Sequence, residues 1–87
     1  MTQPETLERL RAAEYRAVGA SQTAKAIGRG RAQMVFVARD ADRRVIESVL
    51  AAARDRGLEV VEVSSMRDLG RACGIAVGAA AAAILSS

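Results

Sequence analysis

Apolar residues fall along the chain in two alternating patterns, one typical of helices and one typical of buried strands. Apolar positions three and four residues apart predict helices, because such positions share one helical face. The predicted helices span residues 4–16, 21–29, 43–56 and 65–73. Unbroken apolar runs rich in β-branched residues predict strands that are covered on both faces. The predicted strands span residues 34–38, 58–63 and 77–85, with a minor strand near residues 17–19.

Polar residues and glycines mark the ends of the predicted helices. Ser21 is the expected N-cap of the second helix, and Gly30 lies just past its end. The Asp-Ala-Asp stretch at residues 40–42 is expected to cap the third helix. The apolar stripe of that helix is Val45, Ile46, Val49, Leu50 and Ala53. Ser65 and Asp68 form an S-x-x-D pattern, which predicts the start of the fourth helix.

The segment 77–85 is ambiguous, because its successive alanines favour a helix by propensity. It follows a helix that ends at Gly74, however, and an alternation of helices and strands requires a strand at this point. We predict a strand, since alanine suits a position where helices pack closely on both faces. The resulting order predicts one α/β domain over residues 1–87, a three-layer α/β/α sandwich around a small sheet.

Composition limits the function classes that fit such a domain. The chain has 87 residues, of which 51% are hydrophobic and 2% aromatic. The hydrophobic fraction is sufficient for a folded core, but a chain of this length is too short to form a deep enzyme pocket. The lone cysteine, Cys73, excludes an internal disulfide and indicates a reducing, cytoplasmic setting. We expect no signal peptide, and the apolar run 75–85 is shorter than the roughly 20 residues of a membrane span.

The net charge is +3, and arginine supplies nearly all of the positive charge. Arginine suits phosphate and RNA recognition, although a basic surface that serves solubility would have the same composition. The stretch GASQTAKAIGRG at residues 19–30 favours the first explanation. Gln22, Lys25 and Arg29 share one side of its short helix, and the positive end of the helix dipole would face phosphate. A solvated helix face is the alternative, but Gly28 inside the helix indicates either a close approach or a turn requirement.

Other motifs point away from catalysis. Gly28-Arg-Gly30 lacks the third glycine of a dinucleotide fingerprint and precedes a strand instead of following one. Asp40 and Asp42 are better explained as helix caps than as a metal or acid–base pair. The chain has no histidine to complete a metal site or to activate the thiol of Cys73. We therefore expect no catalytic residue, no metal and no cofactor.

Three stretches together, GASQTAKAIGRG, VFVARDAD and SSMRDLGRACGIAVGAAAAAI, resemble the kink-turn-binding ribosomal protein family. That family includes the archaeal L-seven-Ae type, the eukaryotic L-thirty-e type and small bacterial homologues, to which the match is closest. The resemblance covers residues 7–85. It implies an α/β/α sandwich with a mixed four-stranded sheet. It also implies binding to kink-turn RNA, a sharply bent helix–internal-loop–helix with tandem sheared G·A pairs.

The resemblance places the RNA at the second helix and at the loop before the last strand. The residues that it assigns to RNA binding are Gly19, Ala20, Ser21, Gln22, Thr23, Lys25, Arg29, Ile75, Ala76 and Val77. Gln22 and Lys25 would contact the guanines, while Thr23 and Arg29 would lie near phosphate. The residues before Gln22 would supply backbone contacts, and the loop residues would pack against the flipped-out nucleotide of the bulge. From the residues alone, the loop could equally anchor the chain to the core.

The sequence therefore predicts a non-enzymatic RNA-binding protein that recognises and stabilises a kink-turn, as a ribosomal or ribosome-associated component. The expected partner is a structured RNA, either ribosomal RNA or an mRNA leader, with no membrane and no DNA. We expect a cytoplasmic monomer. The alternatives are a protein-interaction module and a detached substrate-binding domain of an RNA-modifying enzyme, because fold alone does not fix function.

Overall fold

The computed structural model describes residues 4–86, and helices and strands alternate in the order expected from the sequence. The elements are α1 Pro4–Ala12, β1 Arg16–Val18, α2 Ala20–Gly28, β2 Ala32–Ala38, α3 Arg43–Asp55, β3 Val60–Val63, α4 Met66–Ala72 and β4 Ala81–Leu85.

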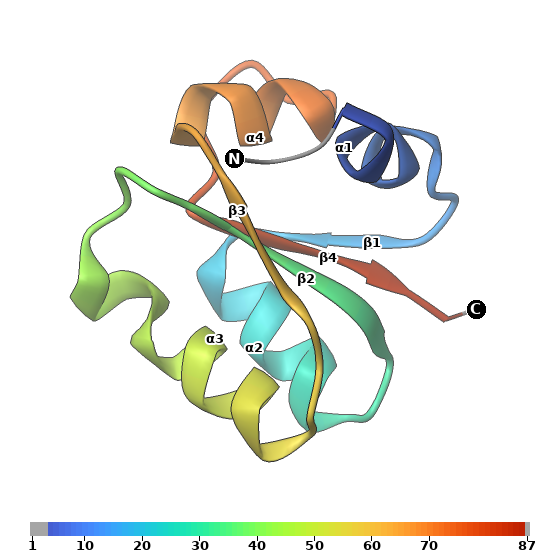
Figure 1. Cartoon of the computed structure of the whole chain (residues 1–87), viewed down its shortest axis with the longest axis vertical. Helices are drawn as coiled ribbons and strands as arrows, with labels where there is room; N and C mark the ends of the chain where they lie inside the picture. The colour runs from blue at the N-terminus through green and yellow to red at the C-terminus, as the bar shows by residue number, and fades with distance from the viewer. Residues whose placement is uncertain (1–3, 87) are drawn as a thin grey trace.

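The strands form one mixed sheet in the order β1-β4-β2-β3 (Figure 1). β4 runs antiparallel to both of its neighbours, and β2 runs parallel to β3. The prediction of a mixed four-stranded sheet is confirmed. The ambiguous alanine-rich segment is a strand, although it begins at Ala81 and not at residue 77. Ala81, Ala82 and Ala83 are fully buried, and their small side chains allow helices to pack closely on both faces of β4.

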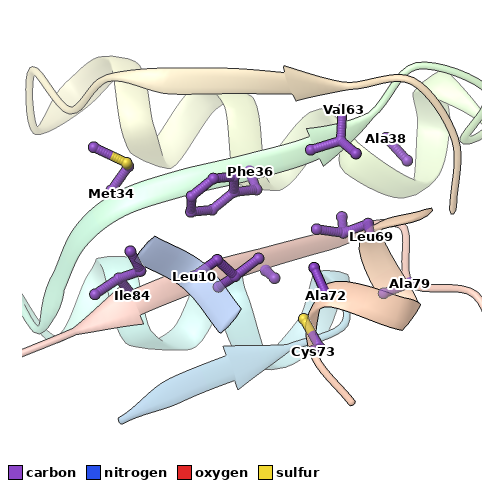
Figure 2. Packing of buried hydrophobic residues seen from close by; sticks show 11 residues of the cluster. Leu10, Met34, Phe36, Ala38, Val63, Leu69, Ala72, Cys73, Ala79 and Ile84 are labelled. Atoms are coloured by element: carbon purple, nitrogen blue, oxygen red, sulfur yellow. The ribbon is translucent and has the colours of Figure 1, made fainter. Parts of the chain in front are cut away.

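Two helices cover each face of the sheet, with α1 and α4 on one face and α2 and α3 on the other (Figure 1). On the first face, Phe36 packs in a cluster with Leu10 and Leu69 (Figure 2). On the second face, Ile27 of α2 and Val49 of α3 pack in another cluster. The three-layer α/β/α sandwich is therefore confirmed. Within residues 4–86, no helix is both long and apolar enough to cross a bilayer.

Several element ends differ from the predictions because contacts distant in sequence set them. α1 ends at Ala12 and not near residue 16, since Arg16 pairs with Ile84 in the sheet. Ser21 is not the N-cap of α2, because the helix begins one residue earlier and Gly19 takes the cap position. Val45, expected in the apolar stripe of α3, is 49% exposed.

The predicted caps of α3 and α4 are partly confirmed. Asp42 caps α3, and its carboxylate accepts a hydrogen bond from the Arg44 backbone N–H at 2.9 Å. Ser65 caps α4, with its hydroxyl accepting from the Asp68 backbone N–H at 3.0 Å. Asp40, in contrast, does not cap α3, because its carboxylate accepts from the backbone N–H of Met66 at 2.8 Å.

Candidate nucleic-acid interface

The amino end of α2 is held in place by its backbone and has no side-chain cap. Gly19 has φ of +95°, a conformation that L side chains rarely adopt. Its N–H donates to the Ala81 carbonyl at 2.8 Å, and its carbonyl accepts from the Thr23 N–H at 3.0 Å. The first backbone N–H groups of a helix have no intrahelical partner. Since no side-chain cap accepts a hydrogen bond at this end, the amides of Ala20 and Ser21 and the positive end of the helix dipole can bind an anion.

The polar stripe expected on α2 is present. Gln22, Lys25 and Arg29 are all exposed. They line one groove, with a volume of about 410 Å³, between α2 and the β1 edge of the sheet. The opposite side of α2 is buried, with Ile27 at 0% exposure. One side of the helix is therefore buried, and the opposite side presents one amide side chain and two basic side chains to solvent.

Thr23 lies on the buried side of α2 and not at its surface. Its side chain is fully buried, and Oγ1 has no hydrogen-bond partner within residues 4–86. A phosphate contact by this side chain, expected from the resemblance, is therefore not available in this structure. The spacing of Thr23, Ala26 and Ile27 at i, i+3 and i+4 was the signal in the sequence, because these positions share one helical face.

Gly28 does not serve the turn that follows α2. Its φ is not positive, and a Cβ at this position would meet nothing within 4 Å. The glycine that the turn uses is Gly30, with φ of +72°. The carbonyl of Gly28 accepts a hydrogen bond from the guanidinium of Arg56 at 2.7 Å, which fixes the carboxyl end of α2. Of the two explanations for Gly28, the turn requirement is thus ruled out.

The loop between α4 and β4 rests on α4 with apolar side chains facing outward. A Cβ at Gly70 would clash with the carbonyl oxygen of Val77, so only glycine permits this contact. The Ala79 N–H donates to the Met66 carbonyl at 3.0 Å. Ile75 is 38% exposed and Val77 is 70% exposed. The loop is anchored through its backbone, and the side chain of Val77 takes no part in the core.

The loop and the amino end of α2 lie at the same end of the sheet. Ala80 and Ala81, which connect the loop to β4, accept hydrogen bonds from Ala38 at 2.9 Å and from Gly19 at 2.8 Å. The structure thus brings together two segments more than fifty residues apart in sequence, both of which were expected to bind RNA. This convergence rests on the central position of β4 between β1 and β2.

Several basic residues beside these segments were not singled out from the sequence. Arg67 and Arg71 line a hollow of about 420 Å³ together with Ile75 and Val77. Arg31 lines the groove beside α2. Arg67 and Arg71 lie four residues apart on α4, so helical spacing could have placed them on one face, whereas Arg31 lies between α2 and β2, where periodicity gives no signal.

The acidic groups near the site have structural roles. The side chain and the backbone N–H of Arg44 hold the pKa of Asp42 below its ordinary value. A hydrogen bond from the Ser64 hydroxyl lowers the pKa of Asp68. Burial raises the pKa of the Cys73 thiol.

Across the described part of the chain, no group of three or more histidine, cysteine or acidic side chains could hold a metal ion. The chemistry offered here is hydrogen bonding and charge attraction toward an anionic ligand.

The chain is similar in sequence to proteins named as RNA-binding and ribosomal proteins. RNA-binding protein YbxF of Geobacillus stearothermophilus is 52% identical over 68 residues, a stretch covering 78% of this chain and 83% of that protein. Large ribosomal subunit protein eL8 of Halobacterium salinarum is 41% identical over 70 residues, covering 79% of this chain and 58% of that one.

A solved structure extends the likeness to the fold. The 15.5kD RNA binding protein of Giardia lamblia has a TM-score of 0.84 and 30% sequence identity, covering 95% of this chain and 72% of that one. A family profile matches residues 3–87, nearly the whole sequence. On the extent of that match and the identity with these relatives, the chain belongs to the Ribosomal protein L7Ae/L30e/S12e/Gadd45 family.

Proposed function

We propose that this chain is a non-catalytic RNA-binding protein that recognises and stabilises kink-turn RNA. The observation that carries the proposal is the convergence of the uncapped amino end of α2, the exposed Gln22 and Lys25, and the apolar loop at one end of the sheet. Relatives named as RNA-binding proteins support the partner class. A relative named as a large ribosomal subunit protein supports a ribosome-associated role in the cytoplasm. The RNA would then be ribosomal RNA, with an mRNA leader as the alternative target.

Each part of the site contacts a different part of the RNA. The amides of Ala20 and Ser21 bind phosphate or base oxygens at the positive end of the helix dipole. The Lys25 ammonium donates to the acceptor edge of a guanine in the sheared pairs, and the Gln22 amide both donates and accepts there. An ordinary RNA major groove is too narrow for such side chains, so the kink must open it.

The loop supplies the shape-dependent part of recognition. Ile75 and Val77 offer an exposed apolar surface at the same end of the sheet as the amino end of α2. An unstacked base packs on such a surface, whereas a base inside a regular duplex cannot reach it. The protein thereby favours the bent RNA over the straight one as a monomer, without any chemical step.

Titration with matched RNAs tests this function. One RNA carries the tandem G·A pairs and bulge, and its partner replaces the G·A pairs with Watson–Crick pairs so that no kink forms. We expect the chain to prefer the kinked RNA by roughly 100-fold. The Gln22→Ala/Lys25→Ala double variant should lose most of that preference. Equal affinity of the unmodified chain for both RNAs would overturn the proposal.

A further inference from the structure

The groove beside α2 continues beyond the residues expected to read the G·A pairs. It starts at Gln22 and Lys25, follows α2 past Arg29, and reaches Arg31 in the turn before β2. Its other wall is the β1 edge of the sheet together with Leu85. The groove therefore extends the candidate interface toward the carboxyl end of α2, away from the loop that precedes β4.

The charge of this groove is uniformly positive. Its lining residues are Arg16, Ala17, Val18, Gln22, Lys25, Ala26, Arg29, Arg31 and Leu85. None of them is acidic. The ion pairs among the side chains that the structure describes involve Arg11, Arg39 and Arg44, so Lys25, Arg29 and Arg31 carry uncompensated charge.

Arg16 differs from the other three cations of the groove. Its guanidinium donates to the carbonyls of Leu10 at 3.5 Å and Ala72 at 3.4 Å, across the layer formed by α1 and α4. It therefore serves the fold, and the charge available to a ligand comes from Lys25, Arg29 and Arg31.

The backbone of Arg31 is fixed, whereas its side chain is free. Its carbonyl accepts hydrogen bonds from the Ser86 backbone N–H at 2.8 Å and from the Ser86 hydroxyl at 3.1 Å. These bonds tie the turn to the end of β4. Arg31 is an exposed residue, and its guanidinium takes part in none of the hydrogen bonds or ion pairs among the described residues. A guanidinium without a partner, on a backbone position that is fixed, is suited to an external anion.

We propose that Arg31, together with Arg29, binds the sugar–phosphate backbone of the RNA stem that continues from the G·A pairs away from the bulge. The inference rests on the proposed function, which sets the direction in which the RNA lies along the groove. The loop at Val77 faces the bulge side, and the groove leads from Lys25 to the opposite side. The guanidinium forks bind phosphate oxygens bidentately, so this contact adds affinity without sequence preference.

Two kink-turn RNAs of equal total length test the placement. In the first, the stem beyond the G·A pairs has roughly one helical turn, and in the second it is cut short while the other stem is lengthened. The variant is Arg31→Gln. Its control is Arg9→Gln, which removes one exposed arginine from α1 on the other face of the sheet. Lys25→Ala is measured in parallel.

We expect Arg31→Gln to weaken binding to the first RNA about fivefold at low salt. The ratio of the variant's Kd to that of the unmodified chain should decrease about threefold between 50 and 200 mM salt, since the variant makes one phosphate contact fewer. On the second RNA, Arg31→Gln should bind as the Arg9→Gln control does. Indistinguishable affinities of these two variants for the first RNA would overturn the inference, and so would an equal loss on both RNAs.

Lys25→Ala separates this inference from the proposed function. If Lys25→Ala weakens binding to both RNAs while Arg31→Gln changes neither, the groove contact is wrong and kink-turn recognition stands. If Lys25→Ala leaves both affinities unchanged, the proposed recognition surface itself is wrong and the groove contact falls with it.

Discussion

Asp40, two residues after the end of β2, accepts a hydrogen bond of 2.8 Å from the backbone N–H of Met66, the first residue of α4. The Met66 carbonyl in turn accepts from the Ala79 N–H at 3.0 Å. One series of hydrogen bonds therefore joins the end of β2, the start of α4 and the loop that precedes β4. Because that loop carries Val77, the hydrogen bond between Asp40 and Met66, which lie 26 residues apart, braces the apolar part of the candidate interface.

Removing this brace should lower stability by an amount typical of a lost helix cap. We expect Asp40→Ala to reduce the free energy of unfolding by about 1 kcal/mol, because the Met66 N–H loses its acceptor. Asp40→Asn should lose less, since its amide oxygen still accepts. Urea denaturation measures both. The control is Asp55→Ala, at the end of α3, which removes an exposed carboxylate with no described hydrogen bond. Equal losses in Asp40→Ala and the control would contradict the bracing role.

Two helical glycines should respond to alanine in opposite directions. At Gly70 a Cβ clashes with the backbone oxygen of Val77, which no side-chain rotation relieves. We expect Gly70→Ala to destabilise the protein by about 2 kcal/mol or more. At Gly28 the space is open and φ is not positive, so Gly28→Ala should stabilise it by about 0.5 kcal/mol. Thermal or urea unfolding gives both values. A neutral Gly70→Ala would mean that the loop does not rest on α4 as described.

Local patterns predicted the order of the elements and the caps that act within a few residues. Asp42 and Ser65 bond to backbone N–H groups two and three residues ahead, a distance that sequence reasoning covers. Asp40 looked like another cap of α3, but its partner arrives through the fold of β3 and α4. The start of α2 was misjudged for the same kind of reason, since the conformation of Gly19 is tied to Ala81.

Helical spacing indicated the exposed side of α2, family resemblance indicated the loop before β4, and neither indicated Arg31. The exposed stripe of Gln22 and Lys25 follows from helical spacing alone. Thr23 was expected near phosphate through family resemblance, although its spacing with Ile27 places it on the buried face. Arg31 lies in a turn, where no periodicity indicates which way a side chain points.

The buried thiol of Cys73 should make stability depend on alkaline pH. Burial raises its pKa, and the nearby charge of Arg16 offsets part of that rise. Well below about pH 8.5 the thiol is protonated in both the folded and the unfolded chain, so the stability that it contributes is fully present there. As pH rises further, the unfolded chain releases the proton first and unfolding becomes more favourable. The free energy of unfolding should therefore fall more steeply for the unmodified chain than for Cys73→Ala. Parallel pH profiles would contradict this.

Val77 should matter for RNA affinity and not for stability. Its side chain is 70% exposed, so Val77→Ser should change the free energy of unfolding by less than about 0.5 kcal/mol. If an unstacked base packs on Val77, the same variant should lose roughly tenfold in affinity for kink-turn RNA, the value of about 1.4 kcal/mol of apolar contact.

An RNA that lacks only the flipped-out base completes a double-mutant cycle for this contact. On that RNA the unmodified chain should bind as weakly as Val77→Ser, and the variant should lose nothing further, because both changes remove one shared interaction. A loss that is the same on the intact and the abasic RNA would show that Val77 acts elsewhere. The cycle also decides between a base and a phosphate as the partner of the loop, since the abasic RNA keeps every phosphate in place.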